Sequence, residues 1–261
     1  MMAVSLIQMD IVAGRPQLNL NHARQSVQQA AEAGAQLAVL PELWASGYDL
    51  GRAAQHADEL DSGLFAEMAS LARTHNIYLA GSLLERHADG FFNTAVLYDP
   101  HGARCGHYRK SHLFRLMDEH HYLQAGDATP VFELPWGATA LAVCYDLRFP
   151  ELFRRFALQG AVLTIVPAQW PARRVAHWRT LLLARAIENQ MIVLGCNRVG
   201  HDGNPDQPFG GHSLACDAWG QVIVEGDADQ TVLTAQLDFD TIHQARSFIP
   251  VFGDRRADLY G

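Results

Sequence analysis

Short apolar runs alternate with longer helical segments along this chain of 261 residues. Four mostly apolar runs have the length of a buried strand, at residues 4–9, 37–40, 162–166 and 191–196. Four segments between or beside them have helical spacing or helix end signals, at residues 18–33, 62–75, 150–159 and 175–190. Strands that alternate with helices form parallel β-α-β units, so the sequence predicts an α/β fold with buried sheets.

Further short strands are expected without a helix between them, at residues 77–82, 92–98, 131–134, 139–144, 213–217, 221–225 and 232–237. The tetrapeptide Asp99-Pro100-His101-Gly102 provides hairpin turn residues after one of these strands. Antiparallel additions to a parallel core predict a mixed sheet or a pair of sheets. No linker rich in Pro, Gly or Ser divides the chain, so residues 1–261 are expected to form one domain.

One weak internal repeat is present. Residues 37–44 and 163–170 are each an apolar run followed by Pro-x-x-Trp. Two similar halves packed sheet against sheet would produce such a repeat, and coincidence between short apolar strings would produce it equally well.

Composition excludes several classes of partner. The formal net charge is −8 and no Lys/Arg run occurs, which argues against nucleic acid or an anionic membrane surface. No apolar stretch approaches the length of a membrane span, and the first residues lack the basic flank of a secretory signal. The four cysteines are far apart and form no CxxC pair, so a reduced, cytoplasmic enzyme is expected.

Cys144 stands where α/β proteins place their chemistry. It follows the apolar residues 140–143, and the polar residues Tyr145, Asp146 and Arg148 come directly after it. Pro150 is suited to the first position of a helix, which puts Cys144 at the carboxyl end of a strand. A single cysteine is most often a buried structural residue, but this polar setting favours a functional one.

Two other charged residues qualify as partners of Cys144. Glu42 follows Pro41 at the end of a buried strand among apolar and aromatic neighbours, where a partly desolvated carboxylate is suited to general base catalysis. Lys110 is the only lysine in the chain, although arginine supplies every other basic side chain. A compact ammonium near Cys144 would stabilise a thiolate or hold an oxyanion. The alternative for each residue is an ordinary surface charge.

Two other patterns are weaker. Gly211-His212-Ser213-Leu214-Ala215 approximates a serine nucleophile elbow, but a strand is expected after the serine rather than before it. His120 and His121 lie beside acidic residues without the spacing of metal ligands, so solvated loop histidines are expected there.

Three separated motifs together resemble the nitrilase (carbon–nitrogen hydrolase) superfamily. They are Pro41-Glu42-Leu43, the segment 108–114 around Lys110, and the segment 144–151 that begins with Cys144. The likeness extends to further runs, namely Glu119 before Ala125-Gly126, residues 167–171, 184–190 and 195–200. It therefore covers nearly the whole chain, with the Glu-Lys-Cys triad of the superfamily in the expected order.

The resemblance implies a four-layer α-β-β-α sandwich that commonly forms a homodimer or a higher homo-oligomer. It also implies that Cys144 attacks the substrate, that Glu42 takes up the thiol proton, and that Lys110 and the backbone N–H of Tyr145 hold the oxyanion. Glu119 matches a second glutamate that positions the lysine in many members. No metal or organic cofactor is implied.

Within the superfamily, the sequence is most similar to the ω-amidase branch, whose members act on small α-keto acid amides such as 2-oxoglutaramate. Arg148 is then a candidate for holding a substrate carboxylate, with an ion pair to Glu151 as the structural alternative. Trp170 is a candidate for the pocket wall, or a core tryptophan. The alternatives for function are a deaminated-glutathione-type amidase, an N-carbamoyl amidase, a nitrilase, or a non-catalytic binding protein on the same scaffold.

Overall fold

Two six-stranded sheets form the centre of the protein, whose computed structural model describes residues 1–260. The first sheet has the order β12-β1-β2-β3-β4-β5 and the second the order β11-β10-β9-β8-β7-β6. The strands of the first sheet are β1 (Met2–Gln8), β2 (Leu37–Val39), β3 (Tyr78–His87), β4 (Gly90–Tyr98), β5 (Arg104–Arg109) and β12 (Thr231–Leu237). Those of the second are β6 (Val131–Phe132), β7 (Thr139–Leu141), β8 (Leu163–Ala168), β9 (Ile192–Asn197), β10 (Leu214–Cys216) and β11 (Val222–Glu225).

Each sheet has a parallel centre with antiparallel strands outside it. In the first sheet β2 pairs in parallel with β1 and β3, and in the second β8 pairs in parallel with β7 and β9. The remaining ladders are antiparallel. The prediction of parallel β-α-β units with antiparallel additions is therefore confirmed.

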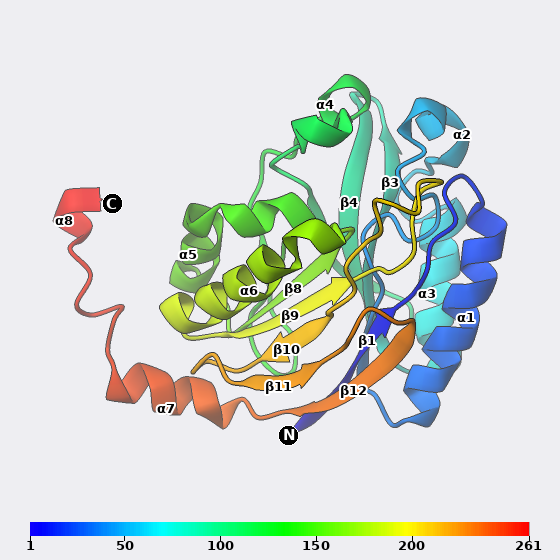
Figure 1. Ribbon diagram of the computed structural model, residues 1–261. Coiled ribbons are helices and arrows are strands. Elements are labelled where there is room, and N and C mark those ends of the chain that lie inside the picture. The colour runs from blue at the N-terminus through cyan, green and yellow to red at the C-terminus, as the bar shows by residue number, and fades with distance from the viewer. Residues whose placement is uncertain (261) are drawn as a thin grey trace.

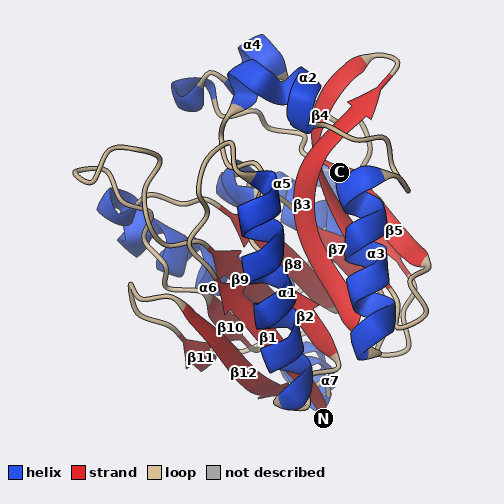
Figure 2. Cartoon of the chain, turned by 90° about the vertical axis from the view of Figure 1, so that its right-hand side faces the viewer, coloured by secondary structure: helices blue, strands red, loops and turns tan. Residues whose placement is uncertain are grey.

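Helices cover the outer face of each sheet. The helices α1 (Pro16–Glu32) and α3 (Gly63–His75) lie across the first sheet (Figure 2). The helices α5 (Pro150–Leu158) and α6 (Val175–Asn189) lie across the second sheet, on the opposite side of the molecule (Figure 1). The inner faces of the sheets meet in one buried cluster, which contains Val39 from the first sheet and Ile165 from the second. The predicted four-layer α-β-β-α sandwich is confirmed.

Strand β2 shows why an uninterrupted apolar run is needed at the centre. Leu37 and Val39 belong to the cluster between the sheets, whereas Ala38 and Leu40 belong to the cluster beneath α1 and α3. Successive side chains of a strand point to opposite faces, so a strand buried on both sides must be apolar at every position. The two segments of the internal repeat form β2 and β8, which hold equivalent places between parallel neighbours.

The remaining α-helices are short or lie near the end of the chain. They are α2 (Ala53–His56), α4 (Glu119–Tyr122), α7 (Asp240–Phe248) and α8 (Ala257–Tyr260). The chain after α7 runs away from the two sheets to α8 (Figure 1). No helix among residues 1–260 is long and apolar enough to cross a membrane.

The structure moves two predicted strand ends by three residues or more. The strand expected at residues 77–82 continues to His87, because β3 pairs with β4 as far as that residue, with Glu85 buried there in an ion pair with Arg109. The strand expected at residues 139–144 ends at Leu141, since Cys144 leaves the extended conformation and opens a 3-10 helix, Cys144–Arg148.

Candidate active site

Four of the predicted site residues lie in one buried cluster. Glu42 follows β2, Lys110 follows β5, Glu119 opens α4, and Cys144 follows β7. Lys110 Nζ lies 2.8 Å from Glu42 Oε1 and 2.6 Å from Glu119 Oε1, and all three side chains are fully buried. The structure thus brings together residues that are up to about a hundred positions apart in the chain.

Cys144 occupies a strained backbone conformation. Its φ of 45° lies in the left-handed region, which is uncommon for residues other than glycine. Asp146 stabilises this turn by accepting hydrogen bonds from Val143 N (2.9 Å) and His112 N (3.0 Å). Asp146 also accepts a bond from Tyr108 Oη (2.9 Å), so the strand that leads to Lys110 is tied to the turn that presents Cys144.

Glu42 is held by two residues that the sequence did not single out. Its Oε2 accepts a bond from Gln169 N (2.9 Å), and its Oε1 accepts one from Asn93 Nδ2 (2.8 Å). Gln169 Nε2 also donates to the Glu42 backbone carbonyl (2.7 Å). Gln169 follows β8, so the ends of the two repeated segments meet at this carboxylate. A polar Asn93 inside the apolar strand β4 is the signal that could have indicated this role, because buried polar groups need a partner.

Tyr48 was also missed as a site residue. Its hydroxyl lies 2.6 Å from Glu119 Oε1 and 2.9 Å from Glu42 Oε1. Burial, followed by the charges of Glu119 and Glu42, raises the pKa of Tyr48 well above its usual value. The hydroxyl therefore keeps its single proton, which it can donate to only one carboxylate at a time.

The charges of the cluster fix the protonation of Lys110 and Cys144. Burial alone would lower the pKa of Lys110, but the charges of Glu119 and Glu42 outweigh it and raise that pKa well above normal, so the amine remains an ammonium. Burial and then the charge of Glu42 raise the pKa of the Cys144 thiol, against the opposing effect of Lys110. Cys144 is therefore a thiol at neutral pH and needs a base in order to act as a nucleophile.

This protonation state is testable in the free enzyme. A group whose pKa is raised stays protonated through neutral pH, so Cys144 should contribute no thiolate absorbance between about pH 6 and about pH 8. The measurement is the difference in ultraviolet thiolate absorbance between the wild-type protein and Cys144→Ser across that range. A titration midpoint below about pH 7.5 in the difference would contradict the electrostatics described above.

Arg148 and Trp170 lie at the cavity in front of Cys144. The cavity is lined by Phe114, Cys144, Tyr145, Arg148, Gln169, Trp170, Pro171 and Arg174. The Arg148 guanidinium lies over the Trp170 ring, 4.7 Å from its centroid. Among residues 1–260, Arg148 makes no ion pair with Glu151 or another acid, so the structural alternative for this arginine is not observed. Trp170 combines its two alternatives, because it is buried and lines the cavity.

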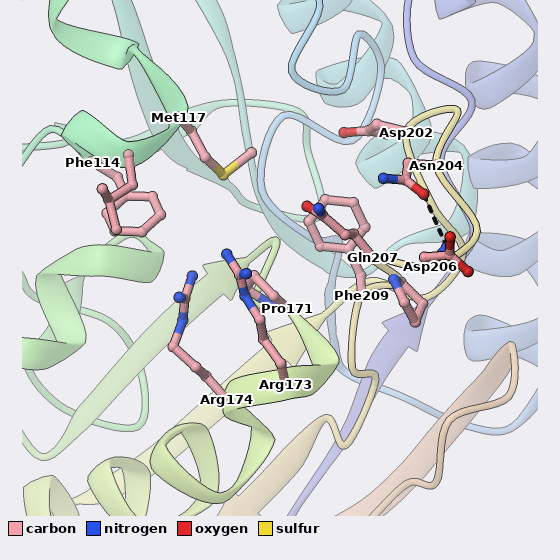
Figure 3. A pocket seen from close by; sticks show the side chains of 12 residues that line it. Phe114, Met117, Pro171, Arg173, Arg174, Asp202, Asn204, Asp206, Gln207 and Phe209 are labelled. Atoms are coloured by element: carbon pink, nitrogen blue, oxygen red, sulfur yellow. Dashed lines mark hydrogen bonds between the residues drawn. The ribbon is translucent and has the colours of Figure 1, made fainter.

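A larger outer pocket adjoins this cavity, and Phe114, Pro171 and Arg174 line both. In Figure 3, Arg173 and Arg174 stand on one side of this pocket and Asp202, Asn204 and Gln207 on the other. Burial, followed by the charges of Arg173 and Arg148, lowers the pKa of Arg174. These three arginines therefore form a positive cluster at the mouth of the site, of which sequence analysis identified only Arg148.

The two weaker sequence patterns have structural explanations. Ser213 is fully buried before β10, where its hydroxyl accepts a bond from Asn197 N (2.9 Å) and donates to Asn197 O (3.1 Å). His120 and His121 are exposed on α4. Within residues 1–260, no group of three or more His, Cys, Asp or Glu side chains is arranged to hold a metal ion.

Comparisons with known proteins agree with this fold. The carbon–nitrogen hydrolase family matches residues 3–247. A 2-oxoglutaramate amidase of Bacillus subtilis is 41% identical over 258 residues, which cover 98% of each chain. The crystal structure of a carbon–nitrogen hydrolase superfamily protein from Xanthomonas campestris, with an arsenic adduct in its active site, superposes with a TM-score of 0.90 at 31% identity, covering 97% of each chain.

A mutant amidase from Nesterenkonia sp. AN1, with acrylamide added at its active-site cysteine, has a TM-score of 0.86 at 30% identity over 100% of this chain and 98% of its own. This chain belongs to the carbon–nitrogen hydrolase family. It is therefore an enzyme that hydrolyses carbon–nitrogen bonds, and the resemblance identified from its motifs is confirmed.

Proposed function

We propose that this enzyme is a thiol amidase that converts a small carboxylate-bearing amide, of the 2-oxoglutaramate or 2-oxosuccinamate type, to the acid and ammonia. The proposal is supported by the 2-oxoglutaramate amidase among its relatives and by the site itself. The observation that carries it is the placing of Cys144, beside a buried ammonium and two carboxylates, at the base of a cavity with a positively charged mouth.

The mouth of the site favours an anionic substrate. Among the described residues, Arg148, Arg173 and Arg174 make no ion pair with a side-chain carboxylate. Arg148 and Arg174 line the same cavity as Cys144. A carboxylate can accept paired hydrogen bonds from a guanidinium, and here no protein carboxylate competes for them. An amide whose far end carries a carboxylate therefore suits the charge of this site.

In the first half of the reaction Cys144 forms a thioester. Glu42 takes the thiol proton while Sγ attacks the amide carbon, and the carbonyl oxygen becomes an oxyanion. Lys110 has three N–H groups, of which two contact carboxylates, whereas Tyr48 Oη is 3.5 Å from Nζ. The third N–H can therefore bind the oxyanion, together with the Tyr145 N–H in the first turn of the 3-10 helix. Glu42 then protonates the departing nitrogen, and ammonia leaves.

In the second half water hydrolyses the thioester. Glu42, again a carboxylate, takes a proton from water as the water oxygen attacks the thioester carbon. Collapse of this second oxyanion breaks the C–S bond and returns the proton to Sγ, which releases the carboxylic acid. Glu119 holds Lys110 throughout, since its Oε2 is itself fixed by the Phe114 N–H (2.7 Å).

The substrate class is tested by ammonia release from a panel of amides. The panel contains 2-oxoglutaramate, 2-oxosuccinamate, glutamine, N-carbamoyl amino acids and simple nitriles. We expect the highest kcat/KM with one of the two oxo-amides. Release from another class, with none from either oxo-amide, would replace this assignment by an N-carbamoyl amidase, a nitrilase or another amidase.

The role of Arg148 has its own expected result. Arg148→Met should raise KM for 2-oxoglutaramate by about 10- to 100-fold, because a charge-assisted pair of hydrogen bonds to the carboxylate is lost. The neutral amide of the same length, pentanamide, should be hydrolysed with unchanged kcat/KM. Arg155→Met, on the exposed face of α5, is the matched control. Equal losses for the charged and the neutral substrate would show that Arg148 does not bind the carboxylate.

We further propose that residues 1–261 act as one catalytic domain, in a homodimer in the cytoplasm. Large apolar side chains exposed on α6, on the loop after β10 and on α7 support self-association, namely Ile187, Trp219 and Phe248. All four cysteines are free, as in a reducing compartment. Light scattering coupled to size exclusion should give the mass of a dimer, and a monomer mass at micromolar concentration would contradict this assembly.

A further inference from the structure

A fully buried arginine lies behind the active site, outside the cluster that touches Cys144. Arg198 follows β9, and its side chain is completely inaccessible to solvent. Every N–H of its guanidinium has an acceptor, and these are Val199 O, Gln169 Oε1, Asp202 Oδ1, Asp10 Oδ1 and Ile11 O. Burying a guanidinium is costly unless it is fully satisfied, so this arrangement allows little freedom of orientation.

Two of these contacts share one nitrogen. Arg198 Nη1 donates to Gln169 Oε1 (2.9 Å) and to Asp202 Oδ1 (2.6 Å). Gln169 holds Glu42 through its backbone N–H and its side-chain amide. Asp202 begins the outer loop (residues 202–209), which forms one wall of the outer pocket in Figure 3. The same nitrogen therefore connects the wall of the pocket to the residue that holds Glu42.

The guanidinium also determines which way the Gln169 amide faces. Arginine can only donate hydrogen bonds, so the group facing Arg198 must be the Gln169 oxygen. The amide nitrogen must then face the Glu42 carbonyl, which can only accept, as the 2.7 Å contact requires. If Arg198 released Gln169, the amide could rotate and Glu42 would lose a fixed partner.

The outer loop contacts Arg198 at both ends. Asp202 pairs with its guanidinium, and the Phe209 ring lies beneath it, with the Arg198 Cζ 4.2 Å from the ring centroid. The Phe209 backbone also forms a bridge with Pro171, close to the cavity of Cys144. If the outer loop shifts when substrate binds, Arg198 must either move with the loop or resist the shift.

We propose that Arg198 is a positioning residue that couples the outer loop to Glu42 through Gln169, so that the seating of the loop sets how well Glu42 accepts the Cys144 proton. The inference rests on the proposed function, because it takes Glu42 as the base. It goes beyond that function by assigning the pocket wall a part in the proton transfer.

The test uses alkylation of Cys144 by iodoacetamide, which needs no amide substrate. Sulfur forms a bond to the methylene carbon, iodide leaves, and the thiol proton goes to Glu42. Asp202→Asn should slow this reaction by about 3- to 10-fold, because the charged acceptor at Nη1 is lost. Gln169→Met, which keeps the backbone N–H to Glu42, should slow it by a similar factor. The double variant should be no slower than the slower single variant, because both changes break one connection.

Asp206→Asn is the matched control, since it removes one charge from the same loop at a residue without a contact to Arg198. Any change that Asp206→Asn makes in the alkylation rate should multiply with the change made by Gln169→Met, because the two sites are independent. Arg198→Lys keeps the charge but not the planar guanidinium, so Cys144 in this variant should be alkylated as slowly as in Asp202→Asn. Its kcat should fall by the same factor, with KM little changed. Thermal unfolding identifies any variant that fails to fold. If Arg198→Lys fails to fold, Asp202→Asn still tests the coupling, because Asp202 lies at the partly exposed end of the network.

Two results would overturn the inference, and they are distinguishable. If Glu42→Gln hydrolyses 2-oxoglutaramate with the wild-type kcat, Glu42 is not the base, and the proposed mechanism fails together with the coupling. If Glu42→Gln loses kcat but Asp202→Asn is alkylated at the wild-type rate, or its slowing multiplies with that of Gln169→Met, the mechanism stands and only the coupling fails.

Discussion

Replacing Cys144 with alanine is expected to abolish turnover while leaving the fold intact. We expect kcat/KM to fall by at least about 10⁴-fold, because the covalent route needs the sulfur and no other nucleophile lines the cavity at that point. The side chain shortens by one atom in a turn whose backbone is held by Asp146. The loss of stability should therefore stay near about 1 kcal/mol, which thermal unfolding would record.

The other buried cysteines provide the control for this experiment. Cys216 in β10 is as deeply buried as Cys144, and burial raises its pKa to about 12, but it lies away from the cluster. Cys216→Ala should keep the wild-type kcat within about twofold, at a similar cost in stability. A folded Cys144→Ala variant that releases ammonia at more than about a hundredth of the wild-type rate would exclude the thioester mechanism.

The elements were predictable where a single local signal decides the structure. Residues 37–40 are apolar at every position because β2 is buried on both faces, and that pattern is visible without coordinates. The 3-10 helix at Cys144 was not predictable in this way. Its left-handed residue is stabilised by Asp146, which is held by Tyr108 in β5 and by His112 just after that strand.

Some site residues were likewise predictable from local sequence and others were not. Glu42, Lys110 and Cys144 each stand at the end of a strand in a recognisable motif, so their meeting could be inferred once the family resemblance placed those motifs together. Tyr48 and Asn93 act only through the partners that they reach across the fold. The residues next to Tyr48 in the sequence do not indicate that its hydroxyl lies between two glutamates.

The arginines of the site show most clearly what local sequence cannot predict. Arg148 was identified because it follows Cys144 closely, whereas Arg174 reaches the same cavity from the 3-10 helix after β8. Which arginines lack a partner is decided by the acids near them in space. The positive mouth of the site is therefore a property of the folded chain rather than of any segment.

Removing the carboxylate of Glu42 is the second change expected to have a large effect. Glu42→Gln should lower kcat by about 10²- to 10⁴-fold with KM little changed, since the base acts in the chemical step and is not part of the arginine cluster. Lys110 keeps Glu119 as an ionic partner in this variant. By contrast, a change at Lys110 would leave two buried carboxylates facing each other, which makes it a poorer probe of mechanism.

The effect of Glu42→Gln on stability must be distinguished from its effect on catalysis. Both Glu42 oxygens accept bonds from donors that are fixed, so the amide nitrogen of a glutamine at this position has to face one of them. We expect a cost of about 1–3 kcal/mol in unfolding free energy from that unmatched pair. Glu85→Gln is the control, because Glu85 is equally buried and also bonded to a cation, Arg109, outside the cluster. It should lose comparable stability, measured by denaturant unfolding, and keep wild-type kcat. If the two variants lose activity equally, the effect of Glu42→Gln comes from the fold, and Glu42 is not the base.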